Sequence, residues 1–558
     1  MQRSAHPVAR KLTALGIILI VILAAALRIW GIDWGLPTAR HYFSYHPDET
    51  VTLLAALKVN FFEGQLDPGF YNYGSLYIYL VSISVLLVSC LGLIDLSHED
   101  IFSNIGEFAK LYLTGRVAAV LLGIATVYLV YLLGKRMCGR GVGLLAALFM
   151  AAMPIHVMHS RFLAVDVPAT FLVVAALIFA FRIPEGHRLR DYLLSGLFAG
   201  LAAGTKYSAG LVILSPIVAH LATGKAGPFR RVLSGKLASV LIAAAAGFLI
   251  GTPGAVLYRH GFARDFLYEF WHAKMGHGFV FAGTGSGYVY HFTHSLWDGM
   301  GLPLLALATI GILYAFCRRT TGDLILLVFV VAYYAVIGAA QVKFARYVIP
   351  LLPVLAILAA RVSSDLIAGL LKRGLFAKAL GYIAVLVLLL ITGYTLFYSL
   401  ALDRVFASTD TRDRAAAWVR NNVLPGSSIG LPTIPWFYTP PLDPYFGLVD
   451  SGDRRERVEE FLDYALVVGT REWDAALLKR ELPDYVILSE FEYEDRLRIR
   501  DKAAERYFRV LERDYRLERR FADAPSLFGL RVPALRELPH DMSYASPTIL
   551  IYARKGIG

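Results

Sequence analysis

Two adjacent carboxylates, Asp48 and Glu49, stand just after the first hydrophobic segment, within the stretch YFSYHPDETVTLLAAL. Pro47 followed by two acids is typical of a helix start, where proline fits the first position and acidic side chains favour the helix dipole. A carboxylate in such a place could also point into a cavity and take a proton from an attacking hydroxyl group. The two interpretations are compatible, because the helix would aim the carboxylate.

Ionisable side chains occur in three further unusual places. Arg161 and Asp166 lie in SRFLAVDVPATF, Lys206 lies in GTKYSA, and Lys343 and Arg346 lie in QVKFARYVIP. Each has an ordinary interpretation, either a loop ion pair or a cation that extends to the membrane interface. Together, however, cations suit a phosphate leaving group and a carboxylate suits a general base. A lipid-linked phosphosugar would need both.

Other motifs favour neither a metal nor a nucleotide. The histidines of the 258–298 loop lack the spacing of a tight ligand set, so we expect no catalytic zinc, and nothing in the sequence requires a cofactor, although a divalent metal is compatible with it. The glycines of FVFAGTGSGYVYHF lack a following Lys-Ser/Thr and indicate a flexible loop instead of a phosphate loop. Cys90, Cys138 and Cys317 lie in or beside hydrophobic runs without metal spacing.

The composition indicates a polytopic membrane protein. Of the 558 residues, 57% are hydrophobic and only 18% are charged, and the mean hydropathy is +0.55. Many uncharged runs approach the length that spans a bilayer. The net charge of +12 comes from cations that mostly flank these runs, so we expect them to set topology and contact anionic lipids, not nucleic acid.

Basic clusters mark the cytoplasmic side of a membrane protein. They are Arg3/Arg10/Lys11, Lys135/Arg136/Arg140, Arg182/Arg188/Arg190, Lys225/Arg230/Arg231/Lys236, Arg318/Arg319 and Arg361/Lys372/Arg373/Lys378. If all share one side, an even number of crossings separates neighbouring clusters. Three runs, 12–27, 68–94 and 117–134, lie between the first two clusters, so one does not cross. We expect 68–94, which starts with Tyr, Gly and Asn, to be re-entrant or interfacial.

The same argument gives about eleven transmembrane helices, with a retained first helix, a cytoplasmic N-terminus and an outward turn near Lys206. We predict a transmembrane domain, 1–402, and a small α/β extracytoplasmic domain, 403–558. The helical pattern TRDRAAAWVRNNV and the strand-like runs DYVILSEF and SPTILIYAR lie in the tail. This topology puts Asp48, Asp166 and the cations on the same outer face, where ionisable groups usually line a cavity.

Four motifs in this order, HPDE, HSRFLAVDVPATFLV, GLAAGTKYSAGLVIL and RYVIPLLP, resemble the glycosyltransferase family 39 branch of the GT-C superfamily. These enzymes use polyprenyl-phosphate sugars and include protein O-mannosyltransferases and the aminoarabinose transferase for lipid A. The resemblance covers residues 15–360 and implies a GT-C fold in the cell membrane, with interfacial helices in a long first outer loop.

The resemblance implies an inverting transfer, in which an acceptor group attacks the anomeric carbon of the sugar and the lipid phosphate leaves. Asp48 would be the base, with Glu49 beside it as a further catalytic candidate. Asp166 matches the second acidic site and would orient the acceptor or the surroundings of Asp48.

The resemblance also implies the substrate contacts. Lys206 and Arg346 would hold the donor phosphate, with Arg161 as a further candidate, and His46 and Tyr207 would contact substrate. For His46 and Glu49, structural support of the site stays open as the alternative. The lipid A branch carries a Lys-Pro-Pro element where this chain has FYNYGSLYIY, which makes a lipid A acceptor less expected. The sequence identifies neither the sugar nor the acceptor, which could be a lipid, a glycan or a protein.

Two other functions would use the same charges differently. A transporter or flippase for a lipid-linked or anionic substrate often has internal repeats with broken helices in matching halves, and only one glycine-interrupted pair, near Lys206, is evident. A non-catalytic membrane scaffold would leave the charged groups of the outer face unexplained.

Overall fold

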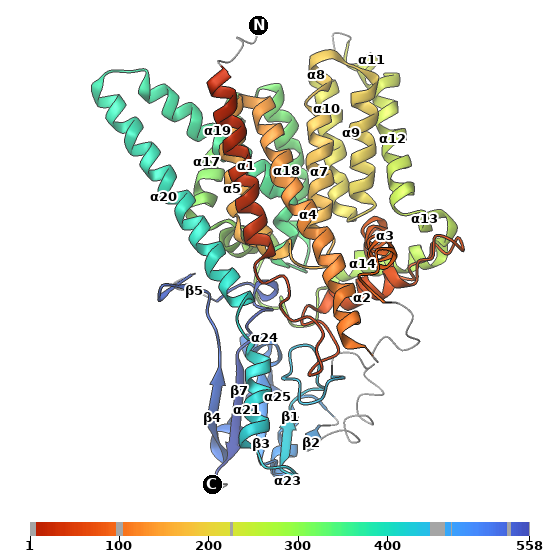
Figure 1. Ribbon diagram of the computed structural model, residues 1–558, viewed down its shortest axis with the longest axis vertical. Coiled ribbons are helices and arrows are strands. Elements are labelled where there is room, and N and C mark those ends of the chain that lie inside the picture. Colours follow the sequence, from red (N-terminus) through yellow and green to blue (C-terminus); the bar gives the residue numbers. More distant parts are fainter. Residues whose placement is uncertain are drawn as a thin grey trace.

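The computed structural model describes residues 7–95, 104–223, 227–446, 464–469, 471–532 and 537–556. A bundle of helices is followed along the long axis of the molecule by a smaller part built on a β-sheet (Figure 1). Of the basic residues used above to predict topology, Arg3 and Lys225 lie outside the described residues.

The first part of the chain consists of helices joined by loops. Its elements are α1 (Pro7–Ile29), α2 (Pro47–Leu57), α3 (Leu76–Cys90), α4 (Ile105–Cys138), α5 (Arg140–Ala152), α6 (Pro154–His159), α7 (Asp166–Ala180), α8 (Ile183–Gly186), α9 (Leu189–Ala203), η1 (Tyr207–Ile213), α10 (Leu214–Thr223), α11 (Pro228–Val232), α12 (Gly235–Gly251), α13 (Gly254–Leu257), α14 (Arg259–Met275), α15 (Gly287–Tyr290), η2 (His291–Leu296), α16 (Trp297–Met300), α17 (Leu302–Arg318), α18 (Thr321–Ala339), η3 (Ala345–Leu351), α19 (Leu352–Leu371) and α20 (Leu375–Phe406).

Within the described ranges, seven helices are long and apolar enough to cross a membrane, or eight if the bent pair Gly287–Met300 and Leu302–Arg318 forms one span. Other apolar helices, among them α3 and α5, are shorter. The figure of eleven crossings therefore stays a prediction, as does the interfacial placement of 68–94, in which α3 is the helical part.

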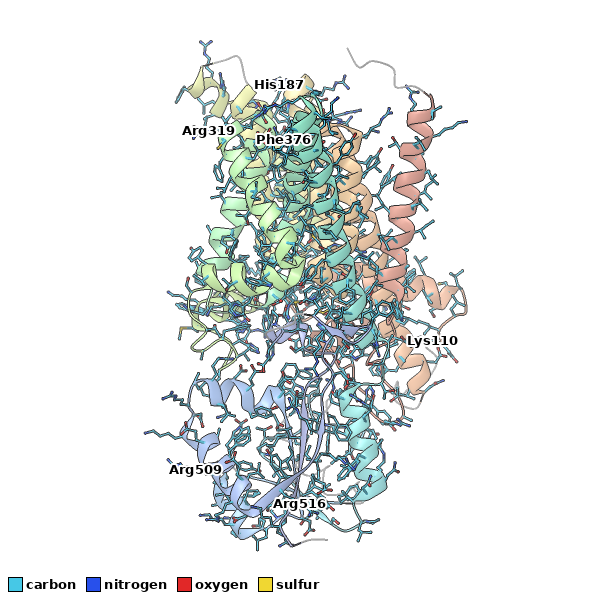
Figure 2. The ribbon with its side chains drawn as sticks, turned by 90° about the vertical axis from the view of Figure 1, so that its left-hand side faces the viewer. Lys110, His187, Arg319, Phe376, Arg509 and Arg516 are labelled. Carbon is cyan, nitrogen blue, oxygen red and sulfur yellow. The ribbon has the colours of Figure 1, made fainter. Side chains whose placement is uncertain are left out.

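The predicted cytoplasmic clusters and the sheet lie at opposite ends of the molecule. The N-terminus, α8 and α11 are at one end in Figure 1, and the five-stranded sheet is at the other. In Figure 2, Arg319 and His187 are at the first end, whereas Arg509 and Arg516 are at the second. The side of the membrane on which each end lies stays a prediction from the basic clusters.

Small residues allow the close approach of α9 and α12. A Cβ at Gly200 would collide with the carbonyl of Ala244, and one at Gly247 would collide with the carbonyl of Leu197. Such small-residue contacts are the usual way in which helices approach closely in a membrane. The pair ends at Gly204, whose carbonyl accepts a hydrogen bond from the Leu76 amide (3.0 Å), so that the start of α3 is fixed beside the turn that precedes η1.

The tail forms a mixed sheet of strand order β2-β1-β3-β7-β4. Its elements are α21 (Thr411–Asn422), β1 (Ser428–Leu431), β2 (Ala465–Val468), α23 (Ala475–Arg480), β3 (Tyr485–Ser489), α24 (Glu490–Arg498), α25 (Lys502–Asp514), β4 (Tyr515–Phe521), β5 (Ser526–Leu527), β6 (Leu530–Arg531), η4 (His540–Met542) and β7 (Ile549–Arg554). β1 pairs in parallel with β2 and β3, and β7 is antiparallel to β3 and β4.

Alternation along β3 gives the sheet two buried faces. Val486 and Leu488 pack with residues of α23 and α25, whereas Ile487 packs on the other face with residues of α21. This is the period of two expected for a strand between helical layers. The predicted helical pattern corresponds to α21, and the two predicted strand runs contain β3 and β7. The predicted domain boundary at 402/403 falls inside α20, which continues to Phe406.

Candidate active site

Asp48 lies in the first turn of α2 and borders a cavity of about 340 Å³. His46 caps the helix, and its Nδ1 accepts a hydrogen bond from the Asp48 amide (3.3 Å). The Asp48 side chain is 31% exposed, and its Oδ2 lies 3.0 Å from Nη2 of Arg346. The helix start therefore presents one carboxylate to open space opposite a cation.

Glu49, the next residue, is fully buried and engaged. Its two oxygens accept hydrogen bonds from Nε (2.8 Å) and Nη2 (2.7 Å) of Arg116 on α4, from Ser44 Oγ (2.5 Å) and from the amide of Leu163 (2.8 Å). Burial alone would raise the pKa of the Glu49 carboxyl, but the Arg116 guanidinium holds that pKa below its usual value. In this arrangement Glu49 fixes α2 to α4, and its expected catalytic role stays a prediction.

Asp166 and Lys206 form a buried ion pair. Asp166 opens α7, and its Oδ1 lies 2.5 Å from Nζ of Lys206, which stands in the turn between α9 and η1. Asp166 is 2% exposed and Lys206 is 8% exposed. The ammonium also lies 4.5 Å from the ring centroid of Tyr347. A carboxylate and an aromatic face thus hold this cation in one place at the edge of a cavity.

Arg346, at the start of η3, connects Asp48 with the tail of the chain. Its Nη2 pairs with Asp48, its Nη1 lies 3.7 Å from Oδ2 of Asp541, and its guanidinium lies 4.0 Å from the centroid of the Phe344 ring. Lys343 points elsewhere, because its Nζ donates to Thr284 Oγ1 (3.0 Å). Of the two cations in QVKFARYVIP, only Arg346 faces the carboxylates.

The structure does not bring Arg161 to this group. Its Nη2 pairs with Asp403 of α20 (2.5 Å) and donates to the carbonyl of Leu27 (2.7 Å), and both charged side chains are about 1% exposed. Among the described lining residues, Arg161 borders neither the Asp48 cavity nor the Lys206 cavity. Arg161 thus fastens the turn after α6 to α20, and its expected contact with the donor phosphate stays a prediction.

The two expected substrate contacts differ in position. His46 is fully buried, its ring packs against those of Phe162 (4.3 Å) and Tyr544 (5.3 Å), and burial lowers its pKa. It supports α2 without bordering the cavity that Asp48 lines. Tyr207 donates to the carbonyls of Tyr71 (2.6 Å) and Tyr73 (3.1 Å), while its side chain lines a second cavity.

Two cavities adjoin at this point. The second, of about 350 Å³, is lined mainly by apolar and aromatic side chains from η1, α14 and α18, with Lys206 among them. Asn72, Tyr73, Glu269 and Tyr347 line both cavities. The tail of the chain supplies an aromatic wall to the Asp48 cavity, formed by Trp436, Phe437, Tyr438, Phe491 and Tyr544. The site is therefore a polar cavity with an apolar extension.

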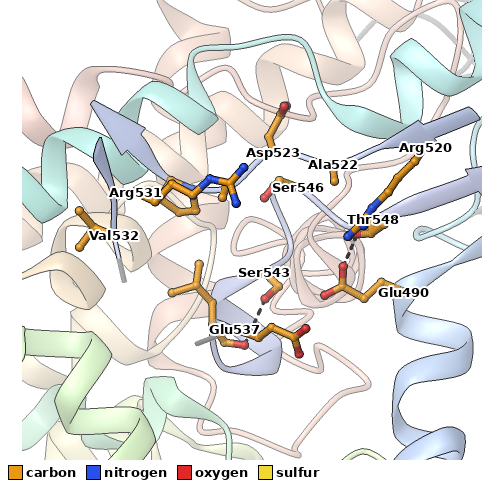
Figure 3. A pocket seen from close by; sticks show the side chains of 13 residues that line it. Glu490, Arg520, Ala522, Asp523, Arg531, Val532, Glu537, Ser543, Ser546 and Thr548 are labelled. Carbon is orange, nitrogen blue, oxygen red and sulfur yellow. Dashed lines mark hydrogen bonds between the residues drawn. The ribbon is translucent and has the colours of Figure 1, made fainter. Parts of the chain in front are cut away.

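A larger cavity of about 580 Å³ lies within the tail (Figure 3). Its lining residues all come from 490–548, and several of its carboxylates have partners already. Glu490 accepts from the Thr548 amide (2.8 Å), and Asp523 pairs with Arg414 (2.5 Å). We place the candidate active site at the smaller cavities, because they bring together Asp48, Lys206 and Arg346.

Sequence reasoning did not identify several residues that the structure places in or beside the site. Arg116 could have been suspected, because an arginine within an apolar helix requires a partner. Asp541 carries no such signal, because it lies in a polar tail. In the part of the chain that the structure describes, no group of three His, Cys, Asp or Glu side chains could hold a metal ion.

Comparisons with known proteins agree with the resemblance found from the motifs. A family described as dolichyl-phosphate-mannose-protein mannosyltransferase matches residues 101–253. A search of curated proteins found no match. The apo oligosaccharyltransferase of Archaeoglobus fulgidus is similar over 96% of this chain and 77% of its own, with a TM-score of 0.50 and 15% identity.

Two further solved structures are similar to the same extent. ArnT from Cupriavidus metallidurans, bound to undecaprenyl phosphate, is similar over 96% of this chain and 97% of its own, with a TM-score of 0.50 and 13% identity. The A. fulgidus protein AglB with an inhibitory peptide and a dolichol-phosphate gives a TM-score of 0.50 at 14% identity, over 97% of this chain and 78% of its own. The expected resemblance to the GT-C superfamily is confirmed, and the chain has the fold of a multi-pass membrane protein.

Proposed function

We propose that this chain is an inverting glycosyltransferase that moves a sugar from a polyprenyl-phosphate donor to an acceptor on the outer face of the cytoplasmic membrane. The observation that carries the proposal is the meeting of the two cavities. One is apolar and reaches Lys206, and the other holds Asp48 opposite Arg346. A phosphorylated lipid requires the first cavity, and an attacking acceptor requires the second.

The apolar cavity suits the lipid end of the donor. Side chains of Leu211, Phe266, Phe270 and Val336 line it, and such a surface favours an isoprenoid chain. Lys206 would meet the phosphate where this cavity adjoins the other, which Arg346 and Tyr347 both line. Undecaprenyl phosphate and dolichol-phosphate appear with two of the similar structures, which supports a donor of this class.

The transfer needs one base and a stabilised leaving group. An acceptor group attacks the anomeric carbon, its proton passes to an Asp48 oxygen, and the bond between that carbon and the phosphate oxygen breaks. The electron pair of that bond stays on the phosphate, where Lys206 and Arg346 neutralise it. Because the leaving phosphate is already anionic, no general acid is required. Attack opposite the leaving group inverts the anomeric carbon.

Asp166 acts through Lys206 in this scheme. Its carboxylate would hold the ammonium at the cavity edge, which replaces the role in orienting the acceptor that the family resemblance implied. Tyr207 keeps a place beside the donor, since its ring lines the apolar cavity. A divalent metal is not required by any step.

The release of lipid phosphate tests the proposal. Purified protein would receive radiolabelled polyprenyl-phosphate sugars together with membrane and envelope extracts as acceptors, and free polyprenyl phosphate would be measured. We expect release that requires both donor and acceptor. A transporter would move the intact donor across vesicles without releasing lipid phosphate, and that result would refute the proposal.

A further inference from the structure

The element that carries Arg346 begins without a capping residue of its own. η3 starts at Ala345, and its residue before the first turn, Phe344, makes no capping hydrogen bond through its side chain. The first amides of such an element need acceptors when they are buried. Both acceptors come from a residue almost two hundred positions later in the chain.

That residue is Asp541 in η4. Its Oδ1 accepts a hydrogen bond from the amide of Ala345 (2.8 Å), and its Oδ2 accepts one from the amide of Arg346 (2.9 Å). The same carboxylate lies 3.7 Å from the Arg346 guanidinium. Asp541 is fully buried, so its charge is compensated by these groups instead of by water. It therefore fixes both the backbone and the side chain of Arg346.

The segment 538–544, which contains Asp541, separates two cavities. His540 and Tyr544 line the cavity of Asp48, whereas Leu538 and Ser543 line the 580 Å³ cavity of the tail, where Figure 3 shows Ser543. The ring of Tyr544 also packs edge-on against His46 at the start of α2 (5.3 Å). The segment thus contacts both elements whose charges meet, α2 and η3.

From this geometry we infer that Asp541 is a positioning residue of the active site. It holds η3 so that the Arg346 guanidinium faces Asp48 and the donor phosphate, which makes the C-terminal domain a component of the donor site. This inference rests on the proposed function, and it adds a residue that touches no substrate. Substitution of Asp541 should therefore weaken donor binding. The same substitution should have no further effect in a protein that already lacks the Arg346 side chain.

Asp541→Asn tests the inference. Asp541→Ser is a second variant, which keeps a small capping oxygen, so that the inference can still be tested if the first variant does not fold. Arg498→Ala is the matched control, because Arg498 donates to the carbonyls of Phe279, Val280 and Ala282 and joins the same domain to the bundle without touching η3. The donor KM, the acceptor KM, and the Kd for polyprenyl phosphate alone would be measured.

We expect both Asp541 variants to raise the donor KM and the Kd for polyprenyl phosphate by about tenfold, because each removes the negative charge beside the Arg346 guanidinium and makes the hydrogen bonds to the η3 amides neutral ones. The acceptor KM should change by less than about twofold, and Arg498→Ala should match wild type. In an Arg346→Ala background, Asp541→Asn should raise the Kd no further. The inference would be overturned if the losses of affinity from Asp541→Asn and Arg346→Ala were additive, or if Arg498→Ala lost as much affinity as the Asp541 variants. Failure of the proposed function is separate, since wild type would then release no lipid phosphate.

Discussion

At the scale of single residues, the two acids at the start of α2 differ in what surrounds them. Asp48 faces a cavity and one cation, whereas Glu49 is enclosed by Arg116, Ser44 and a backbone amide. A base must be reachable by the proton that it takes, and only Asp48 is. The sequence placed both at a helix start but could not tell which one faced the cavity.

Glu49→Gln should reduce the stability of the protein far more than Asp48→Asn does. Removing one charge of a buried pair leaves Arg116 uncompensated, which costs on the order of 3–5 kcal/mol. Loss of the Asp48 charge should cost about 1 kcal/mol or less, because Asp48 is partly exposed and Arg346 keeps Asp541 beside it. Thermal unfolding in detergent measures the difference. Equal unfolding temperatures for the two variants would contradict the structural role of Glu49.

How far the sequence predicted the site depends on where each partner lies. Asp48, Asp166, Lys206 and Arg346 could be singled out, because charged residues beside apolar runs are unusual. Their pairing could not be, since an ion pair such as Lys206 with Asp166 joins separate helices. The salt bridge of Arg161 with Asp403 could not be predicted for the same reason, because the two residues lie more than two hundred positions apart.

At the scale of elements, α24 begins with a buried carboxylate that should make stability depend on pH. Glu492 accepts hydrogen bonds from the Ser489 amide (2.7 Å) and from the Thr433 hydroxyl, and burial raises its pKa from 4.5 to about 7. The folded protein therefore binds this proton more tightly than the unfolded chain does. Stability is highest below the unfolded pKa and falls as pH rises through the interval between these values.

Glu492→Gln should flatten that dependence. The unfolding temperature of wild type should fall between about pH 5 and pH 8, with a contribution from this group on the order of 3 kcal/mol, and that of the variant should change less. Glu512→Gln, at an exposed position of α25, is the control. An identical pH profile for wild type and Glu492→Gln would show that Glu492 is not the titrating group.

The elements themselves were predictable to different degrees. The apolar runs 12–27 and 379–402 predicted α1 and α20 to within five residues at each end, because hydropathy reports directly on burial in lipid. The run 117–134 missed the first twelve residues of α4, which are more polar. The 258–298 segment, expected as a loop, contains α14, whose exposed Phe270 and Trp271 accompany many polar side chains. Its mixed composition masks a helix that would suit a membrane surface.

At the scale of the whole molecule, the parity of basic clusters predicts that the first outer loop and the sheet share one side of the membrane. Cysteine labelling with an impermeant reagent checks this in intact cells, with the three native cysteines replaced. Glu63→Cys and Arg509→Cys should be labelled, and Lys135→Cys should be labelled only after lysis. Labelling of positions 63 and 135 from the same side would overturn the topology.

The assembly of the two parts was beyond the sequence. Charge and hydropathy separated a membrane part from a polar tail, but they carry no information about which residues of the tail contact the helical bundle. The structure shows these contacts. Trp34 Nε1 donates a hydrogen bond to Asp410 (3.0 Å), the Tyr45 hydroxyl donates one to Asp413 (2.7 Å), and aromatic side chains of the tail line the cavity of Asp48. Contacts between such distant segments depend on the folded arrangement.

The turnover of Asp48→Asn tests the central claim most directly. Loss of a general base lowers kcat by about 10²–10⁴-fold, and we expect a reduction in this range in the release of polyprenyl phosphate, with only a small change in the unfolding temperature. Glu63→Gln, an exposed acid of the same loop, should retain wild-type turnover. Wild-type turnover by folded Asp48→Asn protein would contradict the assignment of Asp48 as the base.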